Sequence, residues 1–126
     1  MLKVKKVAIL GFGLEGHALF FYLQGEKDLD ITILDTNSKL KIPKGVKAIL
    51  GRRYLKRLSD FDIIFRSPGI PYNLPEIQKA KYKVSSLTKL FFEKAKGRIV
   101  GITGSSGKTT TATLLYKILK NAGKDA

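Results

Sequence analysis

Two glycine-rich segments in this sequence have the residue types and spacing of phosphate-binding loops. The first, GFGLEG from Gly11 to Gly16, follows an apolar run and precedes a segment with helical spacing. In such a loop the first glycine permits a tight turn, the second admits a pyrophosphate and the third lets the helix pack against the strand. Asp35, which follows the second apolar run, is placed to contact a ribose or a base edge. This pattern by itself predicts a dinucleotide site.

The same loop also fits a purely structural role, because a tight turn from a strand into a helix needs glycine with or without a ligand. The Glu15 carboxylate complements the positive end of the following helix but repels a phosphate group. His17 is the single histidine of the chain, and we assign it to the helix surface rather than to catalysis. This loop by itself therefore does not identify a ligand.

The second glycine-rich segment, ITGSSGKTT, follows the run RIVG and precedes another helical pattern. Its glycines can turn backbone N–H groups toward phosphate oxygens, Lys108 can bridge the terminal phosphates, and Thr109 can offer its hydroxyl to Mg²⁺. The general phosphate-loop pattern is missed by one residue, because Ile102 stands at the position of its first glycine. The ATP-binding residues predicted here are Gly104, Ser105, Ser106, Gly107, Lys108, Thr109 and Thr110, with Thr109 as the metal ligand.

A third motif, SPGIP from Ser67 to Pro71, follows the fourth predicted strand. Two prolines and a glycine make this loop rigid. It would lie at the carboxyl edge of a parallel sheet, where open α/β folds bind their ligands. Taken alone, the motif also fits an ordinary turn.

Short β-branched runs alternate with segments of helical spacing and must position these loops. The runs that predict strands are 5–10, 31–34, 46–50, 62–65, 83–85 and 98–102. Intervals of three and four predict helices along Leu14, Ala18, Phe21 and Tyr22 and along Leu114, Leu115, Ile118 and Leu119. A further helix is expected over 87–97, ending at a glycine. The alternation predicts an α/β fold, with a Rossmann-like open parallel sheet and flanking helices. Gly97 is the expected domain boundary, dividing 1–97 from a strand–loop–helix unit at 98–126.

Composition narrows the possible chemistry. The 126 residues allow one complete domain and part of a second, and 44% hydrophobic residues suffice for a packed core. The absence of cysteine excludes a disulfide framework, a zinc–thiolate site and a cysteine nucleophile. No apolar run reaches the length of a membrane span, and the basic N-terminus lacks the long apolar run of a signal peptide. We therefore expect a cytoplasmic protein that does not bind a membrane.

The formal net charge of +14 is unevenly distributed. Between Asp35 and Asp60 there is no acidic residue, and the cations of this stretch are Lys39, Lys41, Lys44, Lys47, Arg52, Arg53, Lys56 and Arg57. A solvated lysine-rich surface, a site for an anionic ligand or acidic partner, and nucleic-acid binding all fit such a stretch. Few aromatic residues interleave the charge, so nucleic acid is not expected as a partner.

Taken together and in this order, the three motifs and the Asp35-Thr36 pair resemble the Mur ligases over the whole chain. The resemblance implies a first domain of Rossmann type that binds UDP, at 1–97. The strand and helix that begin a central P-loop ATPase domain would follow at 98–126. It also implies cytoplasmic ATP-dependent ligation of D-glutamate to UDP-N-acetylmuramoyl-L-alanine in peptidoglycan synthesis, with ATP and Mg²⁺ as cofactors.

By the same resemblance, the UDP-binding residues are Gly11, Gly13, Leu14, Glu15, Gly16, Asp35, Thr36, Ser67 and Gly69. The backbone of Leu14 and Glu15 would hold the diphosphate, Asp35 and Thr36 would meet the uracil, and the SPGIP loop would close the uridine site. Three positions depart from residues common in the family: Glu15, Asn37 and Ser106.

The remaining magnesium ligands and a carbamylated lysine of the family have no counterpart in these residues, so we expect this chain alone to be inactive. The unit at 98–126 would expose an unpaired strand edge, which favours self-association. A stand-alone dinucleotide- or nucleotide-binding domain is the alternative function, although it leaves Lys108 without a use.

Overall fold

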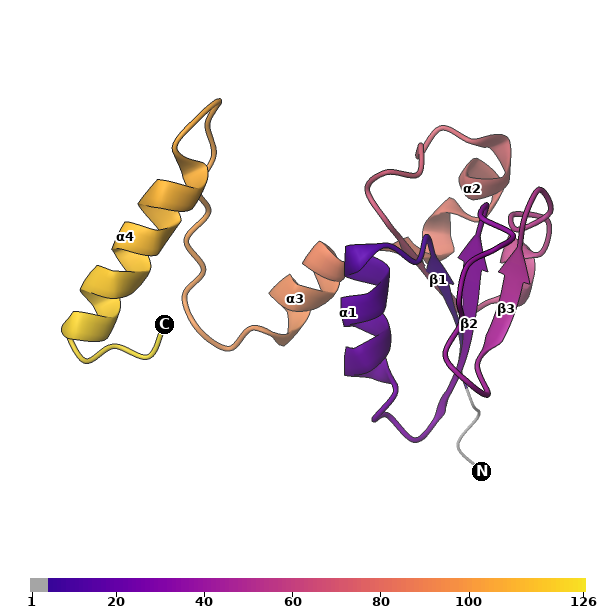
Figure 1. Cartoon of the computed structure of the whole chain (residues 1–126), viewed down its shortest axis with the longest axis horizontal. Helices are drawn as coiled ribbons and strands as arrows, with labels where there is room; N and C mark the ends of the chain where they lie inside the picture. Colours follow the sequence, from indigo (N-terminus) through magenta and orange to yellow (C-terminus); the bar gives the residue numbers. More distant parts are fainter. Residues whose placement is uncertain (1–4) are drawn as a thin grey trace. The chain divides into compact units, whose positions relative to one another are not determined.

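The computed structural model describes residues 5–126 and divides into two compact units, one ending at Lys94 and the other spanning Ala95–Ala126. The first unit is built on five strands: β1 (Lys5–Leu10), β2 (Leu29–Asp35), β3 (Lys47–Leu50), β4 (Ile63–Arg66) and β5 (Val84–Ser85). All neighbouring strands are parallel, in the order β3-β2-β1-β4-β5 (Figure 1). The expected Rossmann-like parallel sheet is thus confirmed, and its strand bounds differ from expectation by at most two residues.

Both faces of the sheet are covered by apolar residues. Strands β1, β2 and β4 contribute to both, because successive side chains of a strand point to opposite faces. One face carries Val7, Ile9, Phe12, Leu19, Phe20, Leu23, Ile33 and Phe65. The other carries Ala8, Leu10, Leu34, Leu58, Phe61, Ile64, Ile77 and Ala80. A strand buried on both sides reads as an unbroken apolar run, which explains why VAIL in β1 shows no alternation of polar residues.

Helices flank the two faces. Helices α1 (Leu14–Leu23) and α3 (Leu87–Lys94) lie on one side of the sheet, and the short α2 (Pro75–Lys79) lies on the other (Figure 1). Two 3₁₀ turns, η1 (Leu58–Asp60) and η2 (Lys81–Lys83), complete the first unit. Between β2 and β3 the chain has no helix, and Leu40, Ile42 and Val46 of that connection pack on the α1 side instead. The sheet is therefore closed on that side partly by an extended segment.

Helix α1 forms as the spacing predicted, but the residues that showed this spacing are not its buried ones. Leu14, Ala18, Phe21 and Tyr22 are all exposed, and Leu14 retains 90% of its accessible surface. The buried side consists of Gly16, Leu19, Phe20 and Leu23. Because α1 is apolar on both sides, intervals of three and four fit two stripes equally well. The approach of the helix to β1 decides between them.

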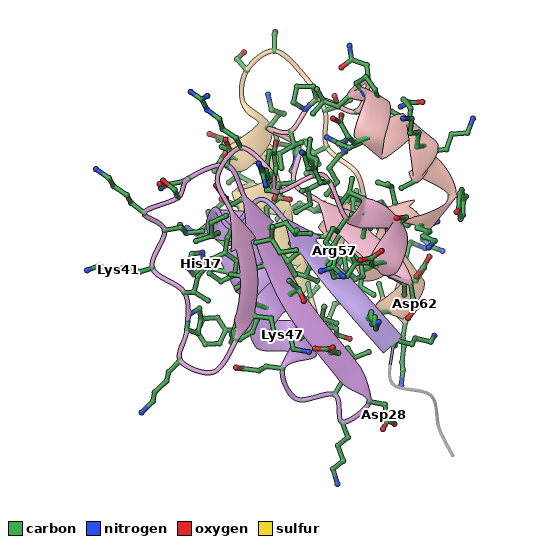
Figure 2. The ribbon with its side chains drawn as sticks, turned by 90° about the vertical axis from the view of Figure 1, so that its right-hand side faces the viewer. His17, Asp28, Lys41, Lys47, Arg57 and Asp62 are labelled. Carbon is green, nitrogen blue, oxygen red and sulfur yellow. The ribbon has the colours of Figure 1, made fainter. Side chains whose placement is uncertain are left out.

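Exposed cations surround the edge strand β3. The eight cations between Asp35 and Asp60 all lie at the surface, and Lys41, Lys47 and Arg57 are visible there in Figure 2. Lys47 pairs with Asp30 at 2.7 Å and Arg57 with Asp60 at 2.6 Å. Charged side chains along an edge strand oppose pairing with another sheet. This arrangement fits the solvated-surface interpretation.

The second unit contains one helix, α4 (Lys108–Asn121), among its described residues. The strand expected at 98–102 was wrong, because this segment has no ladder partner in residues 5–126. A β-branched run becomes a strand only when another strand accepts its backbone hydrogen bonds. The expected helix over 87–97 is shorter than predicted and ends at Lys94.

Residues 1–4, which carry part of the basic N-terminus considered above, lie outside the described residues. Across residues 5–126, no helix combines the length and the apolar character that crossing a bilayer requires.

Candidate functional site

The order of the strands reverses direction between β1 and β4, and the loops that follow these two strands diverge there. Such a switch point opens a crevice at the carboxyl ends of parallel strands, and open α/β proteins bind ligands in it. A small crevice at this place is lined by Ile9, Glu15, Gly16, Leu19, Phe65, Arg66, Ser67 and Leu87. The glycine-rich loop and the SPGIP loop are therefore the two walls of one site.

Neighbouring atoms leave no room for a side chain at two positions of the glycine-rich loop, Gly11 and Gly16, but leave room for one at Gly13. A Cβ on Gly16 would lie 2.3 Å from the Gly11 carbonyl oxygen, so only glycine lets α1 approach the end of β1 this closely. Gly11 has φ +90°, and a Cβ there would meet Ser67 and Ile70 at 3.0 Å. Gly13 has no neighbour within 4 Å of the same point. Its lack of a side chain leaves open space of the kind a ligand's phosphates need.

Asp35 ties the glycine-rich loop to the end of β2. One carboxylate oxygen, Oδ2, accepts the backbone N–H of Phe12 at 2.8 Å. The other, Oδ1, accepts the backbone N–H of Asn37, also at 2.8 Å. An ionised carboxylate has about four acceptor positions. Asp35 can therefore hold the loop and still accept a hydrogen bond from the N–H of a base or the hydroxyl of a ribose, while Thr36 beside it is exposed.

Ser67 joins the two walls of the crevice. Its backbone N–H donates to the Leu10 carbonyl at 2.9 Å, and its hydroxyl donates to the Gly11 carbonyl at 3.0 Å. The N–H of Ile70 donates back to the Ser67 carbonyl at 3.1 Å, which closes a turn over SPGI. Gly69, at the tip of this turn, has open space around it. The structure thus brings Gly11, Gly16, Asp35 and Ser67 together at one edge, as the sequence predicted.

Sequence reasoning missed two residues of this edge. Arg66, the last residue of β4, places its Nη1 among three carbonyls of the SPGIP loop, those of Ser67, Pro68 and Ile70. A charged residue ending an otherwise apolar strand was the signal that could have revealed it. Tyr54 is half-buried, and burial raises the pKa of its phenol above 10.0, with the Asp35 and Glu76 carboxylates adding to the rise.

His17 is exposed on α1, as assigned from the sequence. Its ring lies 3.9 Å from the ring of Phe12, centroid to centroid. Its Nδ1 is 2.9 Å from the Gly13 carbonyl oxygen. These contacts support the glycine-rich loop from the helix side.

The second glycine-rich segment lies in the second unit. Gly107, with φ +75° and no atom within 4 Å of an added Cβ, leads directly into α4. The Lys108 ammonium group donates to the Gly104 carbonyl at 2.6 Å, which wraps the side chain over the loop. Thr109 and Thr110 are exposed at the first turn of α4. Open backbone, a cation and a hydroxyl fit a nucleotide phosphate with Mg²⁺. Among residues 5–126, no three His, Cys, Asp or Glu side chains cluster as a metal site.

Comparison with known proteins gives consistent matches. A family model described as "Mur ligase MurD-like, N-terminal domain" matches residues 5–88. Three similar proteins carry the name UDP-N-acetylmuramoylalanine--D-glutamate ligase. The protein from Acetivibrio thermocellus is 43% identical over 97% of this chain, that from Symbiobacterium thermophilum 35% over 96%, and that from Clostridium kluyveri 37% over 97%. The chain spans only 28%, 29% and 29% of their respective lengths.

Replacing Gly16 with alanine tests the close approach of α1 to β1. We expect Gly16→Ala to lower the free energy of unfolding by about 2 kcal/mol, because the new Cβ must push backbone apart. Gly25→Ala is the matched control, since nothing lies within 4 Å of its Cβ position. Urea unfolding measures both variants. Equal stability of Gly16→Ala and the wild type would show that the approach is not obligatory.

The raised pKa of Tyr54 predicts a loss of stability at alkaline pH. The folded protein holds the phenolic proton more tightly than the unfolded chain, so this contribution is complete below pH 10.0 and disappears as the pH rises through the folded pKa. The difference in phenolate absorbance between wild type and Tyr54→Phe gives the titration of this one group. Its midpoint is expected above 10.0, and a midpoint below that value would contradict the environment described.

Proposed function

Because this chain belongs to the MurD-like Mur ligases through their N-terminal domain, we propose that its first unit binds the uridine diphosphate portion of UDP-N-acetylmuramoyl-L-alanine. One observation carries the proposal. The glycine-rich loop and the SPGIP loop both contribute residues to one small crevice at the point where the strand order reverses. Each loop has open space at a glycine, Gly13 or Gly69, and Asp35 reaches the glycine-rich loop from the end of β2. The names of the relatives supply the substrate, since they describe ligases acting on this UDP-linked sugar.

Each predicted residue then has a role that the local geometry supports. Leu14 and Glu15 begin α1, so their backbone N–H groups have no helical acceptor and are available to the diphosphate. Open space at Gly13 admits the phosphates. Asp35 and Thr36 meet the uracil, and Ser67 with Gly69 covers the uridine. The exposed Glu15 carboxylate is the one group here that opposes a phosphate, so the diphosphate has to be held through the backbone.

We also propose that residues 98–126 begin an ATP-binding domain. Gly104, Ser105, Ser106, Gly107, Lys108, Thr109 and Thr110 would bind the phosphates of ATP, and Thr109 would bind Mg²⁺. When bound, the metal ion neutralises charge on the phosphates. The chain's own contribution is orientation: Gly107 turns backbone N–H groups outward at the start of α4, and Lys108 is held beside them by the Gly104 carbonyl.

The reaction of the whole enzyme is then amide formation driven by ATP. The substrate carboxylate takes the γ-phosphoryl group, which releases ADP, and the amine of D-glutamate displaces phosphate from the acyl phosphate. Positioning and charge neutralisation dominate such phosphoryl transfer. Residues 1–126 supply the site for one substrate and part of the site for ATP in this proposal. We expect them alone to release no phosphate from ATP in the presence of both substrates and Mg²⁺.

Titration of the protein with UDP tests the first site. We expect saturable binding, weakened about tenfold in Asp35→Ala, because the variant loses a ligand contact and the tie to Phe12. Asp62→Ala is a matched control. The Asp62 carboxylate also accepts a backbone N–H, that of Lys6 at 2.8 Å, but at the amino end of the sheet (Figure 2). NAD binding more tightly than UDP would contradict the assignment and favour the stand-alone dinucleotide domain.

A lysine variant separates the two proposed sites. Lys108→Met should reduce binding of ATP with Mg²⁺ at least tenfold, since it removes the cation that faces the phosphates. UDP binding should be unchanged. Lys117→Met is the control, because Lys117 is an exposed lysine on the same helix away from its first turn. Equal losses in both variants would mean that overall charge, not the loop, attracts ATP.

A further inference from the structure

Arg66 occupies an unusual position at the carboxyl end of β4. Its Nη1 carries two hydrogens and donates to the carbonyl oxygens of Ser67, at 3.2 Å, and of Ile70, while the Pro68 carbonyl oxygen lies 3.5 Å away, at the outer limit of hydrogen-bond distance. The guanidinium carbon also lies 5.5 Å from the ring centre of Tyr72, over one face of the ring. One side chain thus gathers three carbonyls of the SPGIP loop and is covered by a residue just beyond it.

The loop has few other means to keep its shape. Pro68 and Pro71 have no N–H, so neither can donate a backbone hydrogen bond. The turn bond from Ile70 to Ser67 is the only backbone–backbone hydrogen bond within the SPGIP segment, which lies wholly inside the described residues 5–126. Carbonyl dipoles that converge on one point repel one another unless a donor lies between them. A guanidinium group supplies both the donor and a positive charge, and charge-assisted hydrogen bonds are the stronger class.

Arg66 differs in this from Arg57. Arg57 pairs with the carboxylate of Asp60 at the surface. Within the described part of the chain, Arg66 forms no ion pair, and all its hydrogen bonds go to backbone carbonyls. It is half-buried, and it lines the crevice between the two loops. The positive charge of Arg66 therefore interacts with carbonyl groups of the SPGIP loop and not with an acidic side chain.

The loop in turn supports the glycine-rich loop. The Ser67 hydroxyl donates to the Gly11 carbonyl, and both Ser67 and Ile70 stand 3.0 Å from the point where a Gly11 Cβ would be. A shift of the SPGIP loop would therefore change the first turn of the glycine-rich loop as well. The shape of both walls of the crevice depends on the same three carbonyls.

We propose that Arg66 is a positioning residue for the ligand site: its guanidinium group fixes the SPGIP loop in the shape that receives the uridine of the ligand. This inference rests on the proposed function. Because the loop is already ordered before binding, less conformational freedom is lost on binding, and affinity rises accordingly. Arg66 would then raise the binding affinity for the uncharged nucleoside and for the charged nucleotide by a similar factor.

The test compares Arg66→Ala with the control Arg57→Ala. We expect Arg66→Ala to weaken binding of UDP about tenfold and of uridine by a similar factor. Arg57→Ala should change neither. Added ethylguanidinium should restore much of the affinity of Arg66→Ala, because it can occupy the vacated position between the carbonyls. Arg66→Lys should be intermediate, since an ammonium group keeps the charge but lacks the planar array of donors.

Hydrogen exchange keeps the inference independent of ligand binding. The Ile70 amide, which donates to Ser67, should exchange faster in Arg66→Ala, while the β1 amides of Ala8 and Ile9 keep their protection. Unchanged exchange at Ile70, or a loss of affinity confined to UDP and absent for uridine, would overturn the role proposed for Arg66. A wild-type protein that binds neither compound would instead overturn the proposed function and the ligand part of this inference, and the exchange result would then decide only whether Arg66 orders the loop.

Discussion

The close contact between α1 and the end of β1 is the constraint on which the rest of the first unit depends. The backbone of the helix approaches the Gly11 carbonyl so closely that a Cβ on Gly16 would lie 2.3 Å from it. That approach fixes the rotation of α1 about its own axis and turns Leu19, Phe20 and Leu23 into the core. It also places the first N–H groups of the helix at the carboxyl edge of the sheet, where an anion can reach them.

Around this contact, polar groups connect the loops at the sheet edge. Asp35 connects the end of β2 to the glycine-rich loop, Ser67 connects the end of β4 to the same loop, and Arg66 holds the loop that contains Ser67. Each link joins a side chain at a strand end to backbone polar groups of a loop. No buried side-chain nitrogen or oxygen in residues 5–126 lacks a hydrogen-bond partner. Loops connected in this way have less conformational freedom to lose if a ligand binds to them.

The second unit, by contrast, contains no sheet among its described residues for its helix to pack against. α4 forms from local hydrogen bonds, but it has no buried residue, and Leu114, Tyr116 and Ile118 remain about half exposed or more. The second glycine-rich segment reaches a left-handed backbone conformation at Gly107 without a neighbouring strand in 95–126. Local sequence is therefore sufficient for the turn and the helix, whereas the self-association expected of this unit stays a prediction.

The sequence by itself determined the parallel sheet, the helices α1, α3 and α4 and the positions of the three loops, because apolar runs, glycines and prolines act through local sterics and short-range periodicity. It also indicated Gly16 and Asp35, whose spacing is characteristic. It did not indicate the short helix α2. Tertiary structure alone decided which side of α1 is buried, since large apolar residues occur on both sides of this helix and the contact of Gly16 with the Gly11 carbonyl selects one of them. It also decided that the β-branched run at 98–102 forms no strand, because strand formation depends on a partner elsewhere in space. The contacts of Arg66 belong to the same class. A charged residue at the end of an apolar strand is visible in the sequence, but three carbonyls converge on its side chain only once the loop has turned back over the end of β4.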